Sequence, residues 1–403
     1  MNTYIYDGLR TPFGRHGGAL SHIRPDDLLS NLIKALITRN SFEYEAYEDV
    51  IIGCTNQAGE DARNLARHAV LLAGLPVTVG GQTVNRLCGS GLAAVIDASR
   101  AISVGEGDLL IAGGAESMSR APFVFSKSEK PFSREFKCFD STIGARFPNP
   151  IVEEKFGNDT MPETADNIAE ELKISRHQVD LFAARSQALY KQASDRGFYE
   201  GELLPIDVYN RQKKVTRTIT TDEHPRPETS IDTLAMLKPL SESGVVTAGN
   251  ASGINDGAAA LILGSRNAGK MANMIPRARI VSAAITGVEP RVMGYGPVRA
   301  SQKALERAGL TLSDLDVIEI NEAFSAQVLG CLTKLGLDYS DSRINPNGGA
   351  IAIGHPLGAS GARLVLTAIR ELEKNNTRFA LVTMCIGVGQ GIALVIEREK
   401  YSL

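Results

Sequence analysis

A cysteine in a glycine-rich turn is the first residue of this chain whose surroundings suit covalent chemistry. Cys88 follows a short extended run, residues 81–84, and precedes Gly89, Gly91 and a series of small apolar residues at helical spacing. This pattern predicts a strand that turns sharply into a helix, with Cys88 at the helix N-terminus. Free backbone N–H groups and the helix dipole favour a thiolate there. Most cysteines are nevertheless buried and inert, so Cys88 needs a partner before chemistry is inferred.

A histidine supplies that partner from the other half of the chain. His355 lies in residues 354–361, Gly-His-Pro-Leu-Gly-Ala-Ser-Gly, again ahead of an apolar helical stretch. The same number of residues separates Val50 from Cys88 as separates Val317 from His355, and both valines lie in apolar runs after a short polar linker. We infer a duplicated domain. If the two copies pack about a pseudo-two-fold axis, Cys88 and His355 face one cavity, where the imidazole can activate the thiol.

Three more polar or reactive positions follow predicted strands of the second half. Asn321 ends one strand, at the place where Cys54 to Asn56 end its counterpart, and ligands sit at the carboxyl ends of parallel strands. Cys385 ends the last strand, before a glycine run that contains Gly387. Backbone N–H groups exposed by such a run can hold an oxyanion. The alternatives are a helix cap for Asn321 and a buried thiol for Cys385.

Apolar runs alternate with amphipathic stretches along most of the chain. The pattern predicts strands at residues 4–7, 50–54, 109–114, 278–284, 317–320 and 379–387, and helices at 26–39, 64–73, 164–172, 178–196, 298–308 and 364–372. Such alternation is typical of an α/β fold with parallel strands covered on both faces. We divide the chain into a first domain (1–119 with 249–275), an inserted loop domain (120–248) that is richer in charge and proline, and a second domain (276–403).

Composition excludes several classes of protein. The chain has 403 residues, 43% hydrophobic and 22% charged, with a net charge of −3, which gives no reason to expect a nucleic-acid partner. Its five cysteines never form a C-x-x-C pair, which argues against a zinc site or a disulfide framework and suits the cytoplasm. No targeting segment precedes the first strand and no apolar run approaches the length of a membrane span, so we expect no membrane partner.

Five stretches together resemble the thiolase family, in order and over the whole chain. They are residues 85–91, 248–257, 321–324, 345–361 and 385–391. The resemblance implies a duplicated thiolase-like fold: two similar α/β domains with layered helices and mixed sheets, and an inserted loop domain that binds CoA and the acyl group. It also implies an acyltransferase that uses coenzyme A as a substrate, with no metal or redox cofactor.

Within the family, the likeness is to the branch that cleaves 3-oxoadipyl-CoA (β-ketoadipyl-CoA) in the catabolism of aromatic compounds. Residues 119–124, 139–144 and 159–165 resemble that branch, and Thr160 stands where general acetoacetyl-CoA thiolases usually carry a histidine. The implied reaction is thiolysis of 3-oxoadipyl-CoA to succinyl-CoA and acetyl-CoA. Its rival is a general acetyl-CoA acetyltransferase or 3-ketoacyl-CoA thiolase. A decarboxylating ketoacyl synthase would carry a second histidine at Asn321, and a non-catalytic acyl-CoA-binding scaffold would not need the reactive residues.

The resemblance also implies a role for each catalytic residue. Cys88 is the nucleophile that carries the acyl group, His355 deprotonates it, and Cys385 is the second acid and base. Asn321 positions a water that forms one oxyanion hole with His355, while the backbone N–H groups of Cys88 and Gly387 form the other.

Substrate contacts follow in the same way. Ser252 contacts the pantetheine arm, Met161 lines the acyl pocket, and Phe324 belongs to the binding residues. Arg217, with Lys213 and Lys214, is a candidate for the CoA phosphates, although charge runs are mostly solvated. Arg146 is the candidate cation for a substrate carboxylate. Cys54, Cys138 and Cys331 are expected in the core, and the family implies a homotetramer (a dimer of dimers).

Overall fold

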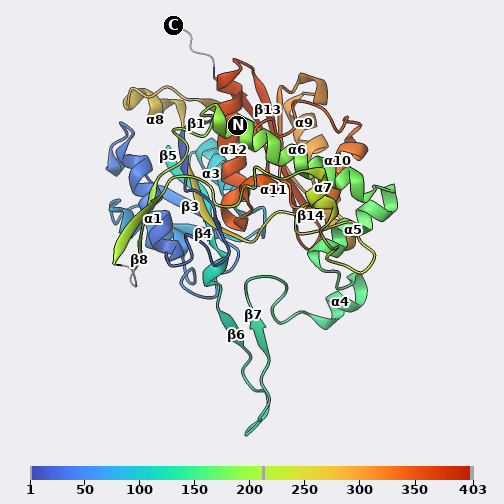
Figure 1. Cartoon of the computed structure of the whole chain (residues 1–403). Coiled ribbons are helices and arrows are strands. Elements are labelled where there is room, and N and C mark those ends of the chain that lie inside the picture. The colour runs from blue at the N-terminus through green and yellow to red at the C-terminus, as the bar shows by residue number, and fades with distance from the viewer. Residues whose placement is uncertain (1, 211–213, 400–403) are drawn as a thin grey trace.

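The computed structural model describes residues 2–210 and 214–399, and a single mixed sheet runs through it (Figure 1). In that sheet the strand order is β12-β13-β14-β11-β1-β10-β5-β3-β4, with β2 attached to β10. The strands are β1 (Thr3–Arg10), β2 (Gly14–Arg15), β3 (Asp49–Gly53), β4 (Gln82–Val84), β5 (Leu109–Ser117), β10 (Asn255–Gly264), β11 (Ala278–Gly287), β12 (Val317–Ile320), β13 (Phe379–Ile386) and β14 (Gln390–Arg398).

Helices cover the faces of the sheet, and two of them lie in the central core. They are α1 (Pro25–Thr38), α2 (Leu65–Ala73), α3 (Ser90–Val104), α4 (Pro150–Phe156), α5 (Met161–Leu172), α6 (Arg176–Asp195), α7 (Ile231–Ala235), α8 (Arg266–Met271), α9 (Gly296–Ala308), α10 (Ser325–Leu335), α11 (Ala350–Ile353) and α12 (Leu357–Lys374). Every helix predicted from periodicity is present, and several begin earlier; α12 begins at Leu357 because its first turns are made of the small residues of the motif, Gly358 to Gly361.

The two halves of the sheet have corresponding strand orders on either side of its middle, where β1 and β11 pair antiparallel. On one side β10, β5 and β3 follow β1; on the other, β14, β13 and β12 follow β11. Strand β10 reaches its place only after the long insertion, which agrees with a first domain built from two separated segments. The domain limits stay a prediction.

Among the described strands, parallel pairing occurs only between β3 and its neighbours β4 and β5, and between β12 and β13. The expectation of parallel sheets is therefore wrong for the other pairs, and the mixed sheet implied by the family resemblance is confirmed. The reason is connectivity. Strand β14 follows β13 through a short turn at residues 387–389, and a hairpin turn joins antiparallel strands.

The hydrophobic core has three parts, and the central one contains α3 and α12. These two helices pack against each other and against β5, with apolar residues of β10 on one side and of β13 and β14 on the other. Helices α1 and α2 cover the outer face of the first half, and α9 and α10 that of the second. Alternate residues of β10, such as Ala260 and Leu261, enter different clusters, as strand geometry requires.

The insertion contains more strand than its sequence predicts. Two hairpins occur in it, β6 (Phe123–Phe125) with β7 (Cys138–Asp140), and β8 (Ile206–Asn210) with β9 (Val215–Ile219). The first projects away from the body of the molecule, at the bottom of Figure 1. Cys138 is exposed on it, so its predicted place in the core is wrong, whereas Cys54 and Cys331 are buried as expected.

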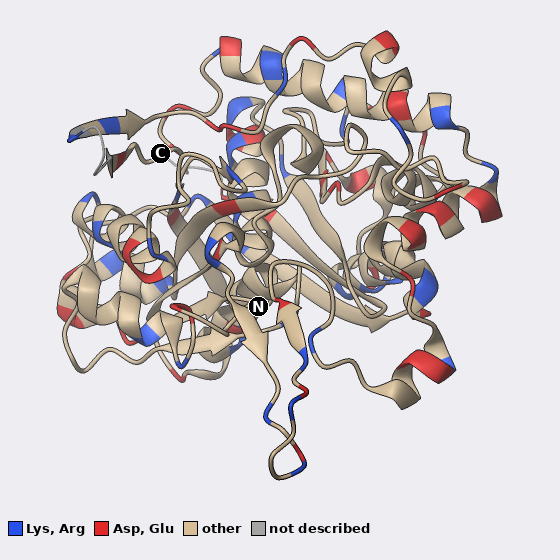
Figure 2. Ribbon diagram, turned by 60° about the horizontal axis from the view of Figure 1, so that its bottom comes forward, with Lys and Arg blue, Asp and Glu red and all other residues tan. Residues whose placement is uncertain are grey.

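Charged residues lie mostly on the outer helices, connecting loops and projecting hairpin, with positive and negative segments interspersed (Figure 2). One apolar stretch, Leu87–Val104, is long and apolar enough to cross a membrane, but 61% of it is buried inside the fold. The expectation that no run approaches such a length is wrong by this measure. Because this stretch is α3 with its preceding turn, its apolarity is explained by packing against α12 and β5.

Candidate active site

Cys88 is held at the entrance of the central helix α3, immediately before the N-cap residue Gly89. The turn before it is tight: Leu87 has a positive φ of 46°, and its N–H donates to Asn85 Oδ1 over 2.9 Å. Ser90 Oγ donates to the Leu87 carbonyl and accepts from the N–H of Arg86. These bonds confirm the predicted strand-to-helix turn, and they leave the Cys88 side chain half-buried.

Cys88 is a neutral thiol at rest. Burial raises the pKa of Cys88 above its ordinary value, and a hydrogen bond from the backbone N–H of Gly387 opposes that shift. The predicted position at a helix N-terminus is therefore correct, but burial outweighs the effect of the helix on ionisation. A nucleophile in this state needs a base at hand.

His355 occupies the matching position before the second central helix, with Pro356 as the N-cap residue of α12. Gly354 has a φ of 107°, and a Cβ there would overlap the amide of Asn255, which accepts from the His355 N–H over 2.9 Å. His355 Nδ1 lies 2.6 Å from Ser360 Oγ, and Ser360 Oγ donates its proton to the Pro356 carbonyl. Nδ1 must therefore carry the ring proton, which leaves the Nε2 lone pair free.

The imidazole is neutral as well. Burial, reinforced by the charge of Arg363, lowers the pKa of His355 to about 3. A neutral ring with a free Nε2 accepts a proton, so His355 has the state and the tautomer that a general base needs.

Asn321 follows β12 and faces that nitrogen. Its Nδ2 lies 3.4 Å from His355 Nε2, and its backbone N–H donates to the Thr383 carbonyl over 3.0 Å. The side chain is fully buried, and its Oδ1 has no hydrogen-bond partner among the described residues. A water has a ready place at such an atom.

Cys385 ends β13 on the other side of Cys88. Burial raises the pKa of Cys385, and the charge of Cys88 adds to the shift. The next residue, Ile386, packs against the Cys88 turn, because a Cβ on Gly89 would lie 2.6 Å from Ile386 Cδ1. The turn after it holds Val388 and Gly389 at positive φ, 62° and 79°, and this turn presents the Gly387 N–H to Cys88. The structure thus brings Cys88, Cys385 and Gly387 to one place, and His355 with Asn321 to another that adjoins it through the first turns of α3 and α12.

The predicted substrate contacts divide into those near this group and those away from it. Met161 begins α5, and its sulfur would lie 3.6 Å from a Cβ on Gly387, so it lies beside the catalytic turn with 40% of its surface exposed. Ser252 donates its backbone N–H to the Ala323 carbonyl, and the preceding residue bridges Phe324. Ser252 and Phe324 are therefore joined next to Asn321.

Comparison with known proteins identifies the family. The model of the thiolase N-terminal domain matches residues 3–267, and that of the thiolase C-terminal domain matches residues 274–398. The chain belongs to the thiolase family.

Its similarity to individual thiolases extends over nearly the full length. It is 58% identical to a 3-oxoadipyl-CoA/3-oxo-5,6-dehydrosuberyl-CoA thiolase of Escherichia coli K12, over 98% of this chain and 99% of that one. It is 53% identical to a beta-ketoadipyl-CoA thiolase of Pseudomonas aeruginosa, over 98% of each. The structure of human mitochondrial 3-ketoacyl-CoA thiolase in complex with CoA matches with a TM-score of 0.90 and 40% identity, over 98% of each chain.

Arg146 lies in the loop between β7 and α4. Its guanidinium donates to the carbonyls of Ser141 and Asn56, over 3.2 and 3.3 Å, and has no carboxylate partner among the described residues. Asn56 adjoins Thr55, whose carbonyl accepts from Asn85 in the Cys88 turn. Arg146 is thus a half-buried cation whose described partners are backbone carbonyls alone, which leaves its charge available to a carboxylate.

The structure does not bring Arg217 to the group. It is exposed on β9, in a hairpin whose Ile206 packs with α1 and α2. Lys214 is also exposed, and Lys213 lies outside the described residues. A pocket of about 370 Å³ instead lies beside Ala248 and Gly249, lined in part by His224 and Arg226. His224 and Arg226 belong to no motif, so the sequence does not point to them, whereas Ala248 and Gly249 lie in one of the family stretches.

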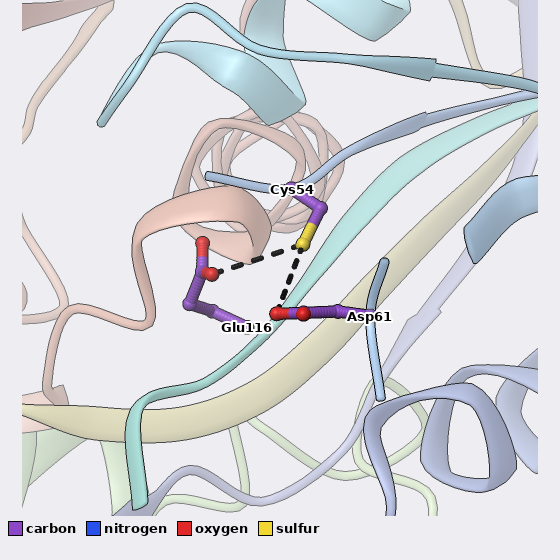
Figure 3. A group of neighbouring side chains, drawn as sticks. All are labelled: Cys54, Asp61 and Glu116. Carbon is purple, nitrogen blue, oxygen red and sulfur yellow. Dashed lines mark hydrogen bonds between the residues drawn. The ribbon is translucent and has the colours of Figure 1, made fainter. Parts of the chain in front are cut away.

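A cluster of three side chains lies behind the Cys88 turn: Cys54, Asp61 and Glu116 (Figure 3). Their ligand atoms lie within 4.8 Å of one another, as a metal site would require. Cys54 Sγ, however, donates to both carboxylates at 3.8 Å, Asp61 Oδ1 accepts from the Gly59 N–H, and both oxygens of Glu116 accept from backbone N–H groups. These hydrogen bonds account for the cluster without an ion, so we assign no metal to it.

Proposed function

We propose that the chain cleaves 3-oxoadipyl-CoA with coenzyme A, giving succinyl-CoA and acetyl-CoA, in the catabolism of aromatic compounds. The observation that supports the reaction is the close approach of the first turns of α3 and α12, which Cys88 and His355 precede, together with the hydrogen bond from the Gly387 N–H, two residues after Cys385, to Cys88. The names of the two bacterial relatives support the substrate.

In the first half-reaction, Cys88 Sγ attacks the 3-keto carbon and gives its proton to His355 Nε2. The bond between C2 and C3 then breaks, and its electron pair stays on C2 as the enolate of acetyl-CoA. Cys385 donates its proton to C2, acetyl-CoA leaves, and a succinyl thioester remains on Cys88.

In the second half-reaction, the thiol of CoA gives its proton to the Cys385 thiolate and attacks the succinyl carbonyl. The tetrahedral intermediate collapses, the bond to Cys88 breaks, and the Cys88 thiolate regains its proton from His355. Succinyl-CoA leaves, and both thiols and the imidazole return to their neutral resting states.

Two oxyanion sites lower the barriers of these steps. The Gly387 N–H already donates to Cys88, and with the Cys88 N–H it suits the oxygen of the tetrahedral intermediate at the acylated carbon. A water at the unpartnered Oδ1 of Asn321, together with His355, suits the thioester oxygen of the leaving enolate. The reaction requires only thiols, a base and these donors, so we assign coenzyme A as a substrate and no metal or redox cofactor.

Substrate binding follows from the surroundings of the group. Met161 borders the acyl pocket, and Arg146 pairs with the terminal carboxylate of the 3-oxoadipyl group. Ser252 and Phe324 flank the pantetheine arm, and the pocket beside Gly249 receives the outer part of CoA, with Arg226 better placed than Arg217 for its phosphates.

The projecting hairpin supports assembly into a homotetramer. Its exposed aromatic side chains include Phe125, Phe132 and Phe136, and Phe132 is completely exposed. Apolar patches of this kind mark protein–protein contacts. We place the enzyme in the cytoplasm, a reducing compartment in which both catalytic thiols stay reduced.

A panel of thiolysis rates tests the substrate. We expect kcat/KM for 3-oxoadipyl-CoA to exceed that for acetoacetyl-CoA and for longer 3-ketoacyl-CoA esters without a carboxylate. A higher value for a chain without the carboxylate would favour the rival assignment, a general 3-ketoacyl-CoA thiolase with the same catalytic residues. Absence of turnover with every ester would leave the acyl-CoA-binding alternative.

A further inference from the structure

Glu116 is a buried carboxylate that the proposed reaction does not use. It lies near the end of β5 with 2% of its surface exposed, and both of its oxygens accept hydrogen bonds. An ionisable group is seldom buried in this way unless its partners are specific. Those partners come from both halves of the chain.

One set of bonds fixes the turn that holds the nucleophile. Glu116 Oε2 accepts from the N–H of Thr55, and Oε1 from that of Asn56, both over 3.1 Å. The Thr55 carbonyl in turn accepts from Asn85 Nδ2 over 3.0 Å, and Asn85 Oδ1 accepts from the N–H of Leu87, the residue before Cys88. A chain of hydrogen bonds therefore runs from Glu116 to the Cys88 turn.

The other bond fixes the helix that follows the base. Glu116 Oε2 also accepts from the N–H of Gly358 over 2.9 Å, in the first turn of α12. Pro356, the N-cap residue, supplies no side-chain cap to this helix. Glu116 acts in its place as a capping carboxylate from the other half, and His355 lies three residues before the capped N–H.

Strand register gives this position a counterpart in the second half. Gly53 of β3 pairs with Gly114 of β5, and Ile320 of β12 pairs with Thr383 of β13. Glu116 lies two residues beyond Gly114, just as Cys385 lies two residues beyond Thr383. The inferred duplication thus places a reactive thiol at this position in one half and a bonded carboxylate in the other.

We propose that Glu116 is a positioning residue, which sets the separation of Cys88 and His355 by binding the nucleophile's turn and the base's helix with one carboxylate. This inference rests on the proposed function for the roles of Cys88 and His355. It requires the reach of the side chain and both acceptor oxygens, because Oε2 is shared between the N–H groups of Thr55 and Gly358 while Oε1 accepts from that of Asn56.

A purely electrostatic role predicts a different outcome. The charge of Glu116 contributes to raising the pKa of Cys88. If charge were its only effect, removal of that charge would make Cys88 more acidic and would leave the geometry unchanged. The two roles are separated by a pair of variants: Glu116→Gln keeps the reach and removes the charge, and Glu116→Asp keeps the charge and removes the reach.

The test measures thiolysis of 3-oxoadipyl-CoA and acetoacetyl-CoA, and the rate of Cys88 alkylation by iodoacetamide against pH. We expect kcat to fall on the order of a hundredfold in both variants, with KM for CoA changed less than about twofold. In Glu116→Gln the midpoint of alkylation should move to lower pH even as turnover falls. Cys54→Ala, which removes one donor to Oε1 and leaves Thr55 and Gly358 bonded, is the control and should retain near wild-type kcat.

Retention of wild-type kcat by either variant would overturn the inference, because Glu116→Asp lacks the reach and Glu116→Gln lacks the second acceptor oxygen. Asn85→Ala gives a second test should the Glu116 variants fail to fold, because Asn85 is exposed and its loss breaks the same chain of bonds. We expect reduced kcat with unchanged KM, and wild-type turnover would again contradict us. If the wild-type enzyme turns over neither ester, the proposed function fails instead.

Discussion

Cys88 and His355 hold the same position ahead of two helices that pack against each other. Each immediately precedes an N-cap residue, Gly89 in α3 and Pro356 in α12. The first turns of these helices approach so closely that a Cβ on Gly91 would overlap the carbonyl oxygen of Gly358. The duplicated arrangement therefore brings a thiol from one half and an imidazole from the other to adjoining places.

The close approach of the two helices is needed for activity. In Gly91→Ala the added methyl group pushes α12 away from α3, and overpacking of this kind costs about 1–3 kcal/mol of the free energy of unfolding. We expect a lower melting temperature and a larger loss in thiolysis than stability alone explains. Gly287→Ala is the control, because a Cβ there meets nothing closer than 3.8 Å. Equal activities of the two variants would contradict the prediction.

The buried neutral state of His355 predicts how stability depends on pH. Its pKa is lowered from an ordinary 6.5 to about 3, so between these values the unfolded chain binds a proton that the native protein does not. The free energy of unfolding contributed by this group is present above pH 6.5 and is lost as the pH falls toward 3. Urea unfolding should show a shallower decline over this window in His355→Gln than in the wild type. Identical declines would show that His355 is charged in the native protein.

Arg146 should determine the choice of acyl group. Its guanidinium donates only to backbone carbonyls among the described residues, so it is available to a substrate carboxylate. In Arg146→Ala we expect kcat/KM for 3-oxoadipyl-CoA to fall about 10–100-fold, the effect of losing a charged hydrogen bond. Turnover of acetoacetyl-CoA should remain. Arg134→Ala, an exposed arginine on the projecting hairpin, should change neither rate, and a uniform loss in Arg146→Ala would contradict the assignment.

The projecting hairpin should hold subunits together. Phe125 and Phe136 form a ring pair with centroids 5.4 Å apart, and both are largely exposed. We expect the double variant Phe125→Ser, Phe136→Ser to sediment as a smaller species than the wild type in analytical ultracentrifugation, with each chain still folded by circular dichroism. An unchanged sedimentation coefficient would show that assembly does not use the projecting hairpin.

Much of this arrangement could be predicted from the sequence, because the patterns that specify it are either local, as in a turn, or repeated in the two halves of the chain. The Cys88 turn follows from Gly89 and Gly91. The place of His355 follows from the repeat, because His355 lies as many residues after Val317 as Cys88 lies after Val50. The antiparallel strands could not be recognised in this way: β10 is an almost wholly apolar run that returns after a long insertion, and periodicity alone carries no strand direction.

Hydrogen bonds between residues far apart in the chain could not be predicted from the sequence either. The bond from Glu116 to Gly358 joins residues on opposite halves, and no motif marks it. The ionisation of Cys88 has a related explanation: the helix terminus, which favours a thiolate, is visible in the sequence, whereas the burial that raises the pKa of this thiol arises from packing of the whole fold. Arg217 lies in a charge run for which the sequence predicts a phosphate contact, and only the fold shows that its hairpin packs with α1 and α2 through Ile206.

The central claim is that Cys88 carries the acyl group, and mass spectrometry of the intact protein tests it most directly. After the enzyme is mixed with 3-oxoadipyl-CoA in the absence of free CoA and quenched in acid, we predict one succinyl adduct per chain, located on the peptide that contains Cys88. Added CoA should remove the adduct, and Cys88→Ser should never acquire it. Turnover without an adduct, or an adduct on another residue, would contradict the mechanism.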